Sequence, residues 1–184
     1  MTKKIGFIVG SLRKDSYNKK IAETFETLLP DGFEAEFLEI GNLPLYNEDL
    51  DVEGKVPEEW TTFREAAKTI DGVFFFTPEY NRSIPASIKN ALDVGSRPYG
   101  ASIWTQKPGL VVSGSMGPIA GFGANHHLRQ SLVFLDVPVL QQPEAYIGTF
   151  QNLVGEDGKF VEPTVEFFQT IVDAYVVFFN KLTA

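Results

Sequence analysis

Two polar loops contain the residues whose types and spacing favour binding chemistry. The first spans residues 10–18 and holds serines, an asparagine and an arginine, and the second spans residues 78–85 between two prolines. Each follows an apolar run, 5–9 or 73–76, that is typical of a strand buried on both faces. In an open parallel sheet, ligands bind beyond the carboxyl ends of the strands, where the strand order reverses. We therefore expect both loops to border one shared site.

The first loop offers the hydrogen-bond donors that a phosphate group needs. Ser11, Ser16 and Asn18 supply side-chain donors, and Arg13 adds a positively charged fork. Backbone N–H groups at the start of the following helix add positive potential. The alternative is that Ser16 only caps the helix and that Arg13 is solvated. Because the spacing matches neither GxGxxG nor GxxxxGKS/T, it favours the monophosphate of FMN over NAD or ATP bound through those motifs.

The second loop suits the flat ring of a flavin. Backbone groups from Glu79 to Asn81 are expected at the polar edge of the ring, and Tyr80 or Pro78 at one of its faces. Nearby N–H donors would stabilise the negative charge that develops on reduction. A third strand end, the Ser-Gly-Ser-Met-Gly segment 113–117, can supply such donors. The alternative is that this segment is a plain glycine-rich connection and that the prolines only fix a turn.

Apolar periodicity predicts the elements that position these loops. Strands are expected at 5–9, 33–40, 73–76, 109–113 and about 138–140, with a later continuation of the fifth strand as an alternative, and a long loop is expected at 41–57. The helices are expected to have these core positions: Ile21, Phe25, Leu28 and Leu29; Trp60, Phe63, Ala67 and Ile70; Ile84, Ile88, Ala91 and Leu92; Leu128, Leu132 and Leu135; Val165, Phe168, Val172, Tyr175 and Phe179. The alternation of strands and helices predicts one α/β domain over residues 1–184, with a parallel sheet covered on both faces.

Composition excludes several classes of function. A net charge of −8 argues against a general nucleic-acid binder, because neutralising phosphates needs a basic surface. The absence of Cys excludes thiolate catalysis and thiolate metal sites, so redox chemistry would need a bound cofactor. The N-terminus lacks a signal-peptide pattern, and the apolar run 174–179 is too short to span a bilayer. We expect a cytoplasmic protein without nucleic-acid or membrane partners.

Three further features receive ordinary interpretations. The pair His126-His127 points in two directions on a helix, so no metal site is expected there. The acidic segment 48–59 is expected to be a solvated loop, with calcium binding as the alternative, although its spacing is not that of an EF-hand. The aromatic last helix is expected to pack in the core, with a subunit interface as the alternative for its excess apolar surface.

Several segments together resemble the NADPH-dependent FMN reductase family of flavodoxin-like proteins, which includes quinone, chromate and azo-dye reductases. In family order, these segments are Gly10-Ser11-Leu12-Arg13 with Ser16 and Asn18, Leu43-Pro44-Leu45-Tyr46-Asn47, Thr77 to Pro85, Lys89-Asn90-Ala91-Leu92-Asp93, Lys107-Pro108, and Gly114-Ser115-Met116-Gly117. The resemblance ends at about residue 142, and no function is transferred to the chain beyond it.

The resemblance implies a flavodoxin-like three-layer sandwich whose five-stranded parallel sheet has the order 2-1-3-4-5. It implies bound FMN, with NADPH or NADH as co-substrate, in a ping-pong hydride transfer through flavin N5 to a quinone, free flavin, azo compound or similar acceptor. No catalytic side chain is needed, and Glu79 is expected to be structural. The implied cofactor-binding residues are Ser11, Arg13, Ser16 and Asn18 at the phosphate, Pro78, Glu79, Tyr80 and Asn81 at the ring, and Ser113, Gly114 and Ser115 nearby.

The resemblance also implies a homodimer or homotetramer with the flavin near a subunit interface. Two other functions stay open from the sequence: a flavodoxin-like electron carrier that binds FMN without using NAD(P)H, and a regulatory module that keeps the fold without flavin. Neither the physiological acceptor nor the choice between NADH and NADPH follows from the residues.

Overall fold

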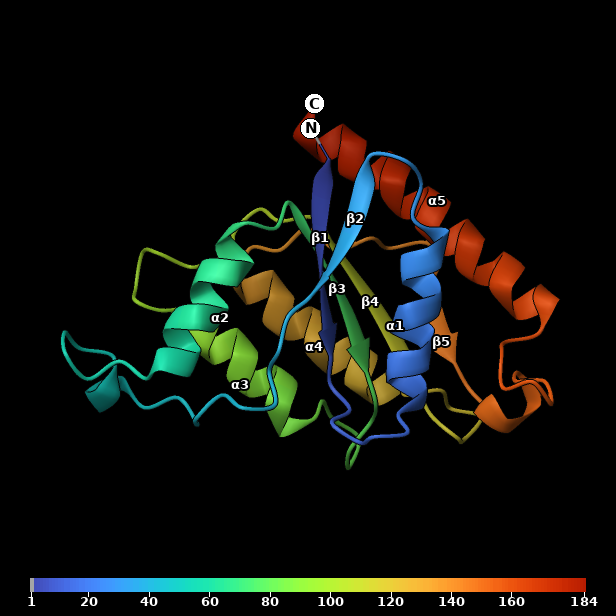
Figure 1. Cartoon of the computed structure of the whole chain (residues 1–184), viewed down its shortest axis with the longest axis horizontal. Helices are drawn as coiled ribbons and strands as arrows, with labels where there is room; N and C mark the ends of the chain where they lie inside the picture. Colours follow the sequence, from blue (N-terminus) through green and yellow to red (C-terminus); the bar gives the residue numbers. More distant parts are fainter. Residues whose placement is uncertain (1) are drawn as a thin grey trace.

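The computed structural model describes residues 2–184 and contains a five-stranded parallel sheet between two layers of helices (Figure 1). The strands are β1 (Lys3–Val9), β2 (Phe33–Phe37), β3 (Gly72–Thr77), β4 (Gly109–Gly114) and β5 (Ala145–Ile147). The helices are α1 (Tyr17–Leu28), α2 (Glu58–Lys68), α3 (Ala86–Gly95), α4 (Phe122–Phe134) and α5 (Glu162–Thr183). The strand order 2-1-3-4-5, with every pair parallel, confirms the flavodoxin-like fold class.

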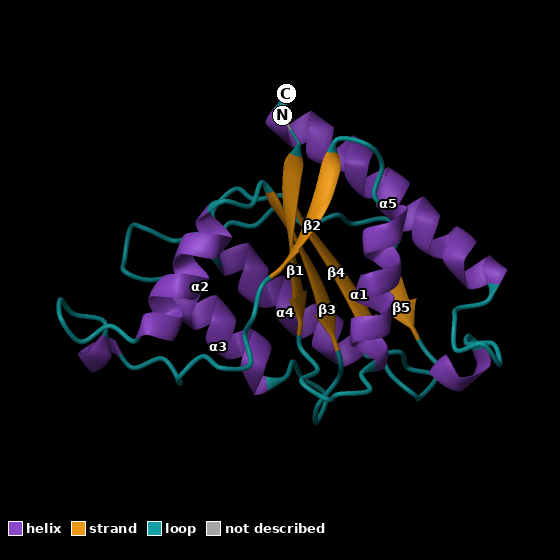
Figure 2. Ribbon diagram, in the orientation of Figure 1, coloured by secondary structure: helices purple, strands orange, loops and turns teal. Residues whose placement is uncertain are grey.

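The central strands are apolar along their length because helices cover both of their faces. In β3, Phe74 and Phe76 enter the core beneath α1 and α5, whereas Val73 and Phe75 enter the core beneath α2, α3 and α4. Figure 2 shows α1 and α5 on one side of the sheet and α2 and α3 on the other. Phe7 of β1 stacks on Phe74 with 5.1 Å between ring centroids, which ties the two strands together through their side chains.

The last helix packs in the core as expected. Phe168, Tyr175 and Phe179 of α5 are fully buried against α1 and the sheet, while Phe167 stays 38% exposed. Most of the aromatic side chains of this helix are therefore buried, because they pack against a sheet face that is rich in phenylalanine.

The predicted position of the fifth strand is wrong. Val139 makes only a single parallel bridge with β4, and β5 itself follows at Ala145–Ile147, beside the second half of β4. Pro138 and Pro143 have no backbone N–H to donate, which limits regular pairing over this stretch. As a result β5 ends level with Gly114, at the edge where the loop after β4 begins.

Periodicity identified the buried faces better than the element ends. The second strand ends at Phe37 rather than at residue 40. Ile70 and Ile84, which helical spacing placed inside helices, lie just after α2 and just before α3. Both side chains still contact the core cluster on that side of the sheet, since element ends fray while the buried stripe persists.

The predicted long loop between β2 and α2 is present, with one 3-10 turn, Glu48–Leu50. Its first half is fastened to α3 by the buried Asn90. The Asn90 Oδ1 atom accepts from the Tyr46 N–H at 2.8 Å, and Nδ2 donates to the carbonyls of Leu43 and Pro44 at 3.1 and 3.0 Å. The oxygen and the NH₂ group of this amide are thus both used to hold the loop.

A buried ion pair fastens the second half of the same loop to α2. Two guanidinium nitrogens of Arg64 donate to the Asp51 carboxylate, each at 2.8 Å, and the Arg64 Nε donates to the Val94 carbonyl at 2.9 Å. The Arg64 and Asp51 side chains are only 10% and 7% exposed. The expectation of a solvated acidic loop at 48–59 therefore fails at Asp51, because its partner Arg64 lies on the following helix α2 at a spacing that forms no local sequence pattern.

The hydrogen bonds from Arg64 hold the pKa of Asp51 below its ordinary value of 3.8. Because the folded-state pKa is depressed, this group stabilises the fold above its unfolded pKa and loses that contribution as the pH falls through the folded value. We expect Asp51→Asn to lower the free energy of unfolding by about 3 kcal/mol near neutral pH, since it leaves Arg64 buried without a carboxylate.

Urea unfolding at about pH 7 and about pH 3 checks this prediction. The difference between the native chain and Asp51→Asn should shrink at the acidic pH, because pH 3 lies below the unfolded pKa of the carboxyl and its stabilising contribution falls from there towards the depressed folded pKa. Asp49→Asn, an exposed carboxylate on the same turn, should change little at either pH. A difference that stays constant with pH would contradict the role given to the ion pair.

Gly72 opens β3 where the sheet meets the buried Tyr175. The Tyr175 hydroxyl donates to the Pro108 carbonyl at 2.9 Å, and a Cβ on Gly72 would overlap that hydroxyl and lie 3.0 Å from the Pro108 oxygen. We expect Gly72→Ala to lower the free energy of unfolding by about 2 kcal/mol or more through overpacking.

A double-mutant cycle with Tyr175→Phe tests that close approach by urea unfolding. Removing the hydroxyl should recover part of the loss in Gly72→Ala, so that the two losses are not additive. Gly117→Ala is the matched control, because its Cβ would meet no atom nearer than 3.9 Å. Strictly additive losses would show that the hydroxyl does not require the glycine.

Candidate functional site

The three loops predicted to form a site meet at the carboxyl edge of the sheet, the lower edge in Figure 1. They follow β1, β3 and β4 at residues 10–16, 78–85 and 115–121. The strand order reverses between β1 and β3, which leaves a crevice at this edge of an open sheet. The Gly10 N–H donates to the Phe76 carbonyl at 2.9 Å. This bond holds the start of the first loop beside the end of β3.

The first loop combines buried hydroxyls with exposed cations. Ser16 is the N-cap of α1, and its Oγ accepts from the Lys19 N–H at 3.2 Å, which leaves its own O–H free to donate. Ser11 is also buried, whereas Arg13 is exposed. Arg13 and Ser16 share the lining of a hollow of about 370 Å³ at the start of α1. Donors, positive charge and a helix N-terminus thus converge, as an anion site requires.

Asn18 has the one buried side-chain oxygen or nitrogen without a hydrogen-bond partner among residues 2–184. The residue is 4% exposed, and its Nδ2 donates to the Gly114 carbonyl at a long 3.4 Å while Oδ1 accepts nothing. A Cβ on Gly114 would lie 2.5 Å from Phe150 and 3.0 Å from that Oδ1, so the packing around Asn18 requires glycine at this position. An unmade hydrogen bond of this kind costs about 1–3 kcal/mol, which a ligand with a donor would recover.

These residues fit FMN. A hydroxyl of its ribityl chain can donate to Asn18 Oδ1, and the second N–H of the same amide can donate to a phosphate oxygen. Ser11, Ser16 and Arg13 supply the remaining polar partners that a phosphate needs. These protein side chains together offer the hydrogen-bonding groups that a ligand with a phosphate attached to a polyol requires.

The second loop is a tight turn with a fixed backbone. Tyr80 and Ser83 exchange two backbone hydrogen bonds of 2.9 Å, and the two residues between them have positive φ, 51° at Asn81 and 66° at Arg82. This is the geometry of a two-residue hairpin turn of the primed type. Pro78 is buried, whereas the Tyr80 side chain is 47% exposed. The turn thus presents a rigid backbone and an aromatic side chain at the edge of the sheet.

Glu79 holds this turn in place. Its Oε1 accepts from the Arg82 guanidinium at 3.1 Å, and its Oε2 accepts from the Ala124 N–H in the first turn of α4 at 3.2 Å. A carboxylate at a helix N-terminus is stabilised by the positive end of the helix. Both carboxylate oxygens are thus engaged inside the protein, in keeping with a structural role.

The third loop is shaped from beneath by Ser113. This side chain is fully buried, and its Oγ donates to the Ala120 carbonyl at 2.9 Å. The Ser115 N–H donates to the Ile147 carbonyl of β5 at 3.0 Å, and the Ser115 Oγ donates to the Gly117 carbonyl at 3.1 Å. The structure therefore places Ser113 under the loop and engages the Ser115 N–H in the sheet, so that the site side of this loop is mainly backbone.

Two residues that sequence reasoning missed connect the loops. Ser87 of α3 donates from its Oγ to the Gly10 carbonyl at 2.9 Å, which joins the first loop to the helix after the second. Asn125 of α4 is fully buried and donates to the Ser113 Oγ at 3.3 Å. The sequence did contain a signal for Asn125, because this polar residue lies on the same face of the helix as Leu128. Burying a polar side chain is unfavourable unless it is hydrogen-bonded, so a buried asparagine indicates a partner.

Apolar side chains surround this edge. The exposed ones are Leu12 on the first loop, Tyr80 on the second, and Met116, Ile119 and Phe122 at the third. Exposed apolar groups gathered around a polar crevice are typical of a site for a flat, largely apolar molecule.

Other residues singled out by sequence have partners elsewhere. The His126 Nε2 lies 3.1 Å from the Tyr146 hydroxyl, and the His127 Nδ1 lies 3.0 Å from the Ser83 Oγ. Within residues 2–184, no cluster of three or more His, Cys, Asp or Glu side chains is arranged to hold a metal ion. Over the same residues, each helix is too short or too polar to cross a bilayer.

Comparisons with known proteins identify the family of this chain. The model of a family described as NADPH-dependent FMN reductase matches residues 3–152. The chain is 53% identical to a quinone reductase of Pseudomonas putida, over 93% of this chain and 91% of that protein. It is 42% identical to a 2-hydroxy-1,4-benzoquinone reductase of a Burkholderia species, over 95% of each.

A solved structure agrees as well. FerB, a flavoenzyme NAD(P)H:(acceptor) oxidoreductase of Paracoccus denitrificans, superposes with a TM-score of 0.90 at 38% identity, covering 98% of both chains. The loops of the carboxyl edge lie within the matched region of the family model, as does every residue assigned to the site. The chain belongs to the NADPH-dependent FMN reductase family of flavodoxin-like oxidoreductases.

Proposed function

We propose that this oxidoreductase is a quinone reductase whose FMN is held by the three loops of the carboxyl edge. The unpartnered Oδ1 of the buried Asn18, at the start of α1, is the observation that carries the placement of the cofactor. The activities for which two relatives are named, quinone reductase and 2-hydroxy-1,4-benzoquinone reductase, support a quinone as acceptor.

Each loop has a separate task in this proposal. Ser11, Arg13, Ser16 and Asn18 bind the phosphate and the adjoining polyol, because they are the polar side chains with free capacity. The backbone from Pro78 through Glu79 and Tyr80 to Asn81 borders the ring, with the turn keeping those groups fixed. Ser113, Gly114 and Ser115 form the third wall, where Ser113 acts through the loop that it holds.

The protein itself contributes binding, orientation and electrostatics. When bound, FMN accepts a hydride from a nicotinamide and delivers the electrons to an acceptor in a second half-reaction. Fixed backbone N–H groups oppose the charge that develops without reorganising at the moment of reaction. The apolar rim formed by Tyr80, Met116 and their neighbours keeps water away and offers a surface to a flat quinone.

Our proposal extends to assembly and location. Residues 1–184 act as one domain, and the chain forms a homodimer or homotetramer in the cytoplasm, with small molecules as its other partners. Exposed apolar side chains away from the site support the assembly: Tyr99 is 93% exposed, Val133 77% and Phe134 87%. Surfaces of this kind are common where subunits meet.

Two buried asparagines provide a test of the cofactor site. We expect Asn18→Leu to weaken FMN binding at least about tenfold, because the ligand loses its amide partners, while the stability of the flavin-free chain changes by less than about 1 kcal/mol. Asn90→Leu should do the reverse, because Asn90 makes three hydrogen bonds within the protein: about 2 kcal/mol or more of stability is lost, and FMN affinity changes little.

Quenching of FMN fluorescence measures the affinity, and urea unfolding of flavin-free protein measures the stability. If Asn18→Leu binds FMN as tightly as the native chain, the phosphate and polyol lie elsewhere and the residue assignment is wrong. If Asn18→Leu unfolds as easily as Asn90→Leu, Asn18 is a structural residue.

Steady-state kinetics test the reaction. FMN-loaded protein should oxidise more than one NADPH per bound flavin only when an acceptor is present, and 1,4-benzoquinone should be a better acceptor than an azo dye. Double-reciprocal plots at several quinone concentrations should be parallel, as two substrates that use one site in turn require. Intersecting lines would contradict the two half-reactions, and bound FMN without NAD(P)H turnover would favour the electron carrier.

A further inference from the structure

The chain between β5 and α5, residues 148–161, forms a small hairpin beside the start of α1, and we call it the β5–α5 segment. It begins with the 3-10 turn Phe150–Asn152, and Val154 then forms an antiparallel bridge with Phe160. The segment lies at the lower right of Figure 1. The family model ends at residue 152, so the family match assigns no role to most of this segment.

Phe150 packs directly against the first residue of α1. Its side chain is 1% exposed, and its ring stacks on the Tyr17 ring with 4.8 Å between centroids and an interplanar angle of 14°. Tyr17 lies between Ser16 and Asn18, two buried polar residues proposed to bind the phosphate and the adjoining polyol. Because a stacked aromatic pair adds stabilisation beyond the area that it buries, this contact holds the start of α1 against the segment.

Phe150 also supports Asn18 through Gly114. A Cβ on Gly114 would lie 2.5 Å from the Phe150 Cζ and 3.0 Å from the Asn18 Oδ1, so the phenyl ring and the amide both lie close to this glycine. The Asn18 Nδ2 donates to the Gly114 carbonyl at 3.4 Å. A shorter side chain at position 150 would leave a cavity here, into which Gly114 and the amide could shift. The position of the unpartnered Oδ1 therefore depends on Phe150.

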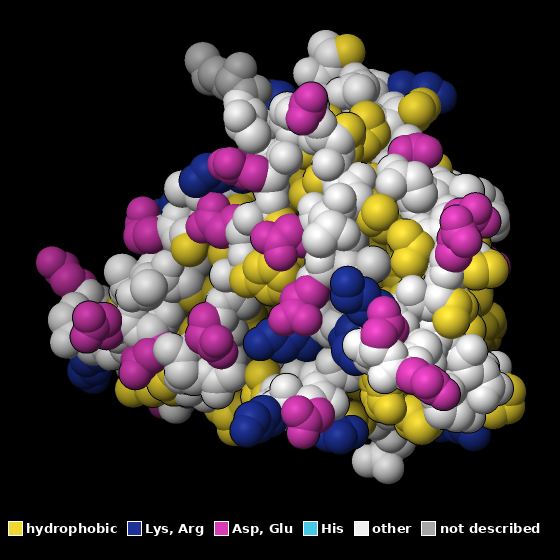
Figure 3. Space-filling model, turned by 45° about the vertical axis from the view of Figure 1, so that its right-hand side comes forward, with side chains coloured by type: hydrophobic (Ala, Val, Ile, Leu, Met, Phe, Trp, Pro, Cys, Tyr) yellow, Lys and Arg dark blue, Asp and Glu magenta, His cyan; other side chains and the backbone are white. Residues whose placement is uncertain are grey.

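The tip of the hairpin makes a second contact with α1. The Lys20 Nζ donates to the Gly158 carbonyl at 2.7 Å, and Gly158 has a φ of 77°, which glycine adopts without strain. Lys20 is one of four cations that line the hollow at the start of α1, with Arg13, Lys14 and Lys19. Figure 3 shows Lys and Arg side chains gathered in the lower middle of one face. The β5–α5 segment thus fastens the first turn of α1 at two points, one at the ring stack and one at this lysine.

The beginning of the segment also contacts the third loop. The Ile147 carbonyl, at the end of β5, accepts from the Ser115 N–H at 3.0 Å, and a Cβ on Gly148 would lie 2.9 Å from the Gly117 carbonyl oxygen. Thr149 has a φ of 50°, a conformation that a non-glycine residue keeps only where surrounding contacts impose it. One short stretch of chain therefore joins the phosphate-binding end of the proposed site to the third loop.

The far side of the hairpin is anchored in the core. Phe160 is 8% exposed, and its ring meets the fully buried Phe168 of α5 edge to face, with 5.2 Å between centroids. The Val161 N–H donates to the Leu153 carbonyl at 2.9 Å, which closes the hairpin next to this pair. Moving the segment away from α1 would therefore expose aromatic surface to water, so the segment is a firm support.

We propose that the β5–α5 segment positions the phosphate-binding end of the FMN site, with Phe150 as the positioning residue for Asn18. Phe150 acts through Tyr17 and Gly114, and its side chain has no polar atom to offer a ligand. The inference rests on the proposed function and deepens it, because it gives a part in phosphate binding to a segment outside the three loops. The ring end of the site is held by other contacts, such as those of Glu79, so truncating Phe150 should affect phosphate binding and leave the hydride step unchanged.

Titrations with two flavins test this role. Riboflavin has the same ring and polyol as FMN but no phosphate, so the ratio of the two dissociation constants reports the contribution of the phosphate. Quenching of flavin fluorescence should show that flavin-free native protein binds FMN at least about tenfold more tightly than riboflavin. In Phe150→Leu the affinity for FMN should fall about tenfold and that for riboflavin no more than about threefold, while kcat at saturating FMN stays within about twofold of the native value.

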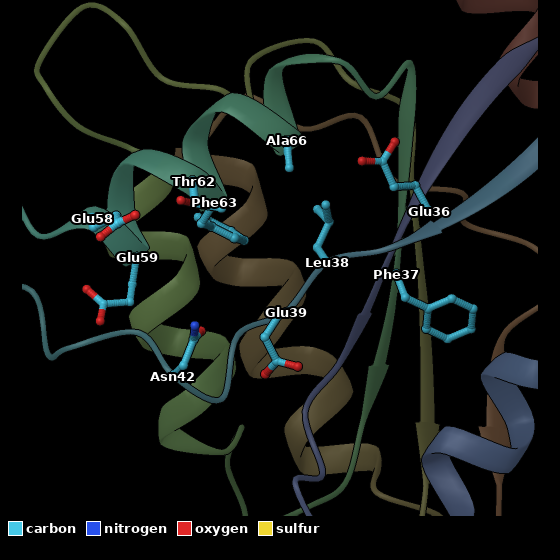
Figure 4. A pocket seen from close by; sticks show the side chains of 10 residues that line it. All are labelled: Glu36, Phe37, Leu38, Glu39, Asn42, Glu58, Glu59, Thr62, Phe63 and Ala66. Carbon is cyan, nitrogen blue, oxygen red and sulfur yellow. The ribbon is translucent and has the colours of Figure 1, made fainter.

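Phe63→Leu is the matched control, because it makes the same exchange at a buried phenylalanine on the other side of the sheet. Phe63 of α2 is 4% exposed, and Figure 4 shows it among the side chains that line a hollow of about 410 Å³ between α2 and residues 36–42. This variant should lower the urea midpoint of unfolding as Phe150→Leu does, yet keep the native ratio of FMN to riboflavin affinity. Tyr17→Leu removes the other ring of the stack and should change that ratio in the same direction as Phe150→Leu, so the test does not depend on the folding of one variant.

An unchanged ratio of FMN to riboflavin affinity in both Phe150→Leu and Tyr17→Leu would overturn the proposal. A loss of equal size for the two flavins would overturn it as well, because it would show a general loosening of the core rather than a change at the phosphate. Native protein that binds neither flavin would refute the proposed function itself, so the native titration tells that failure apart from a failure of the positioning role.

Discussion

The parallel pairing of β1 with β3 is the constraint on which the site depends. It places Val9 beside Phe76 at the last paired position, so that the loops after both strands leave the sheet at the same level. Their packing is close: a Cβ on Gly10 would lie 2.5 Å from Ile88 and 2.8 Å from Pro85. Because the buried strands cannot shift past one another without exposing phenylalanine to water, this separation of the loops is fixed by the core.

The polar groups of the site divide into those used by the protein and those left for a ligand. Glu79 and Ser113 form hydrogen bonds that fix the second and third loops. Those loops therefore present rigid surfaces of backbone and apolar side chains. The first loop is different, since Asn18 and Arg13 keep unused capacity at the start of α1. This division matches a cofactor that is polar at its phosphate end and flat at its reactive end.

The features of this molecule that the sequence predicted are those that leave a local pattern of residues. The strands at β1, β3 and β4 and the loops after them were predictable, because strands buried on both faces leave continuous apolar runs. The fifth strand was misplaced, since prolines break its ladder and only three residues pair with β4. The ion pair of Asp51 with Arg64 and the support of Ser113 by Asn125 were beyond sequence reasoning, because each joins residues that share no local pattern.

Anaerobic stopped-flow absorbance of the FMN-loaded chain mixed with NADPH tests the central claim most directly, namely that the carboxyl-edge loops hold an FMN able to accept a hydride. We expect rapid bleaching of the flavin band, and a smaller bleaching amplitude in Asn18→Leu at FMN concentrations that just saturate the native chain. Flavin that stays bound and oxidised in the presence of NADPH would contradict the account, and so would full bleaching in the variant.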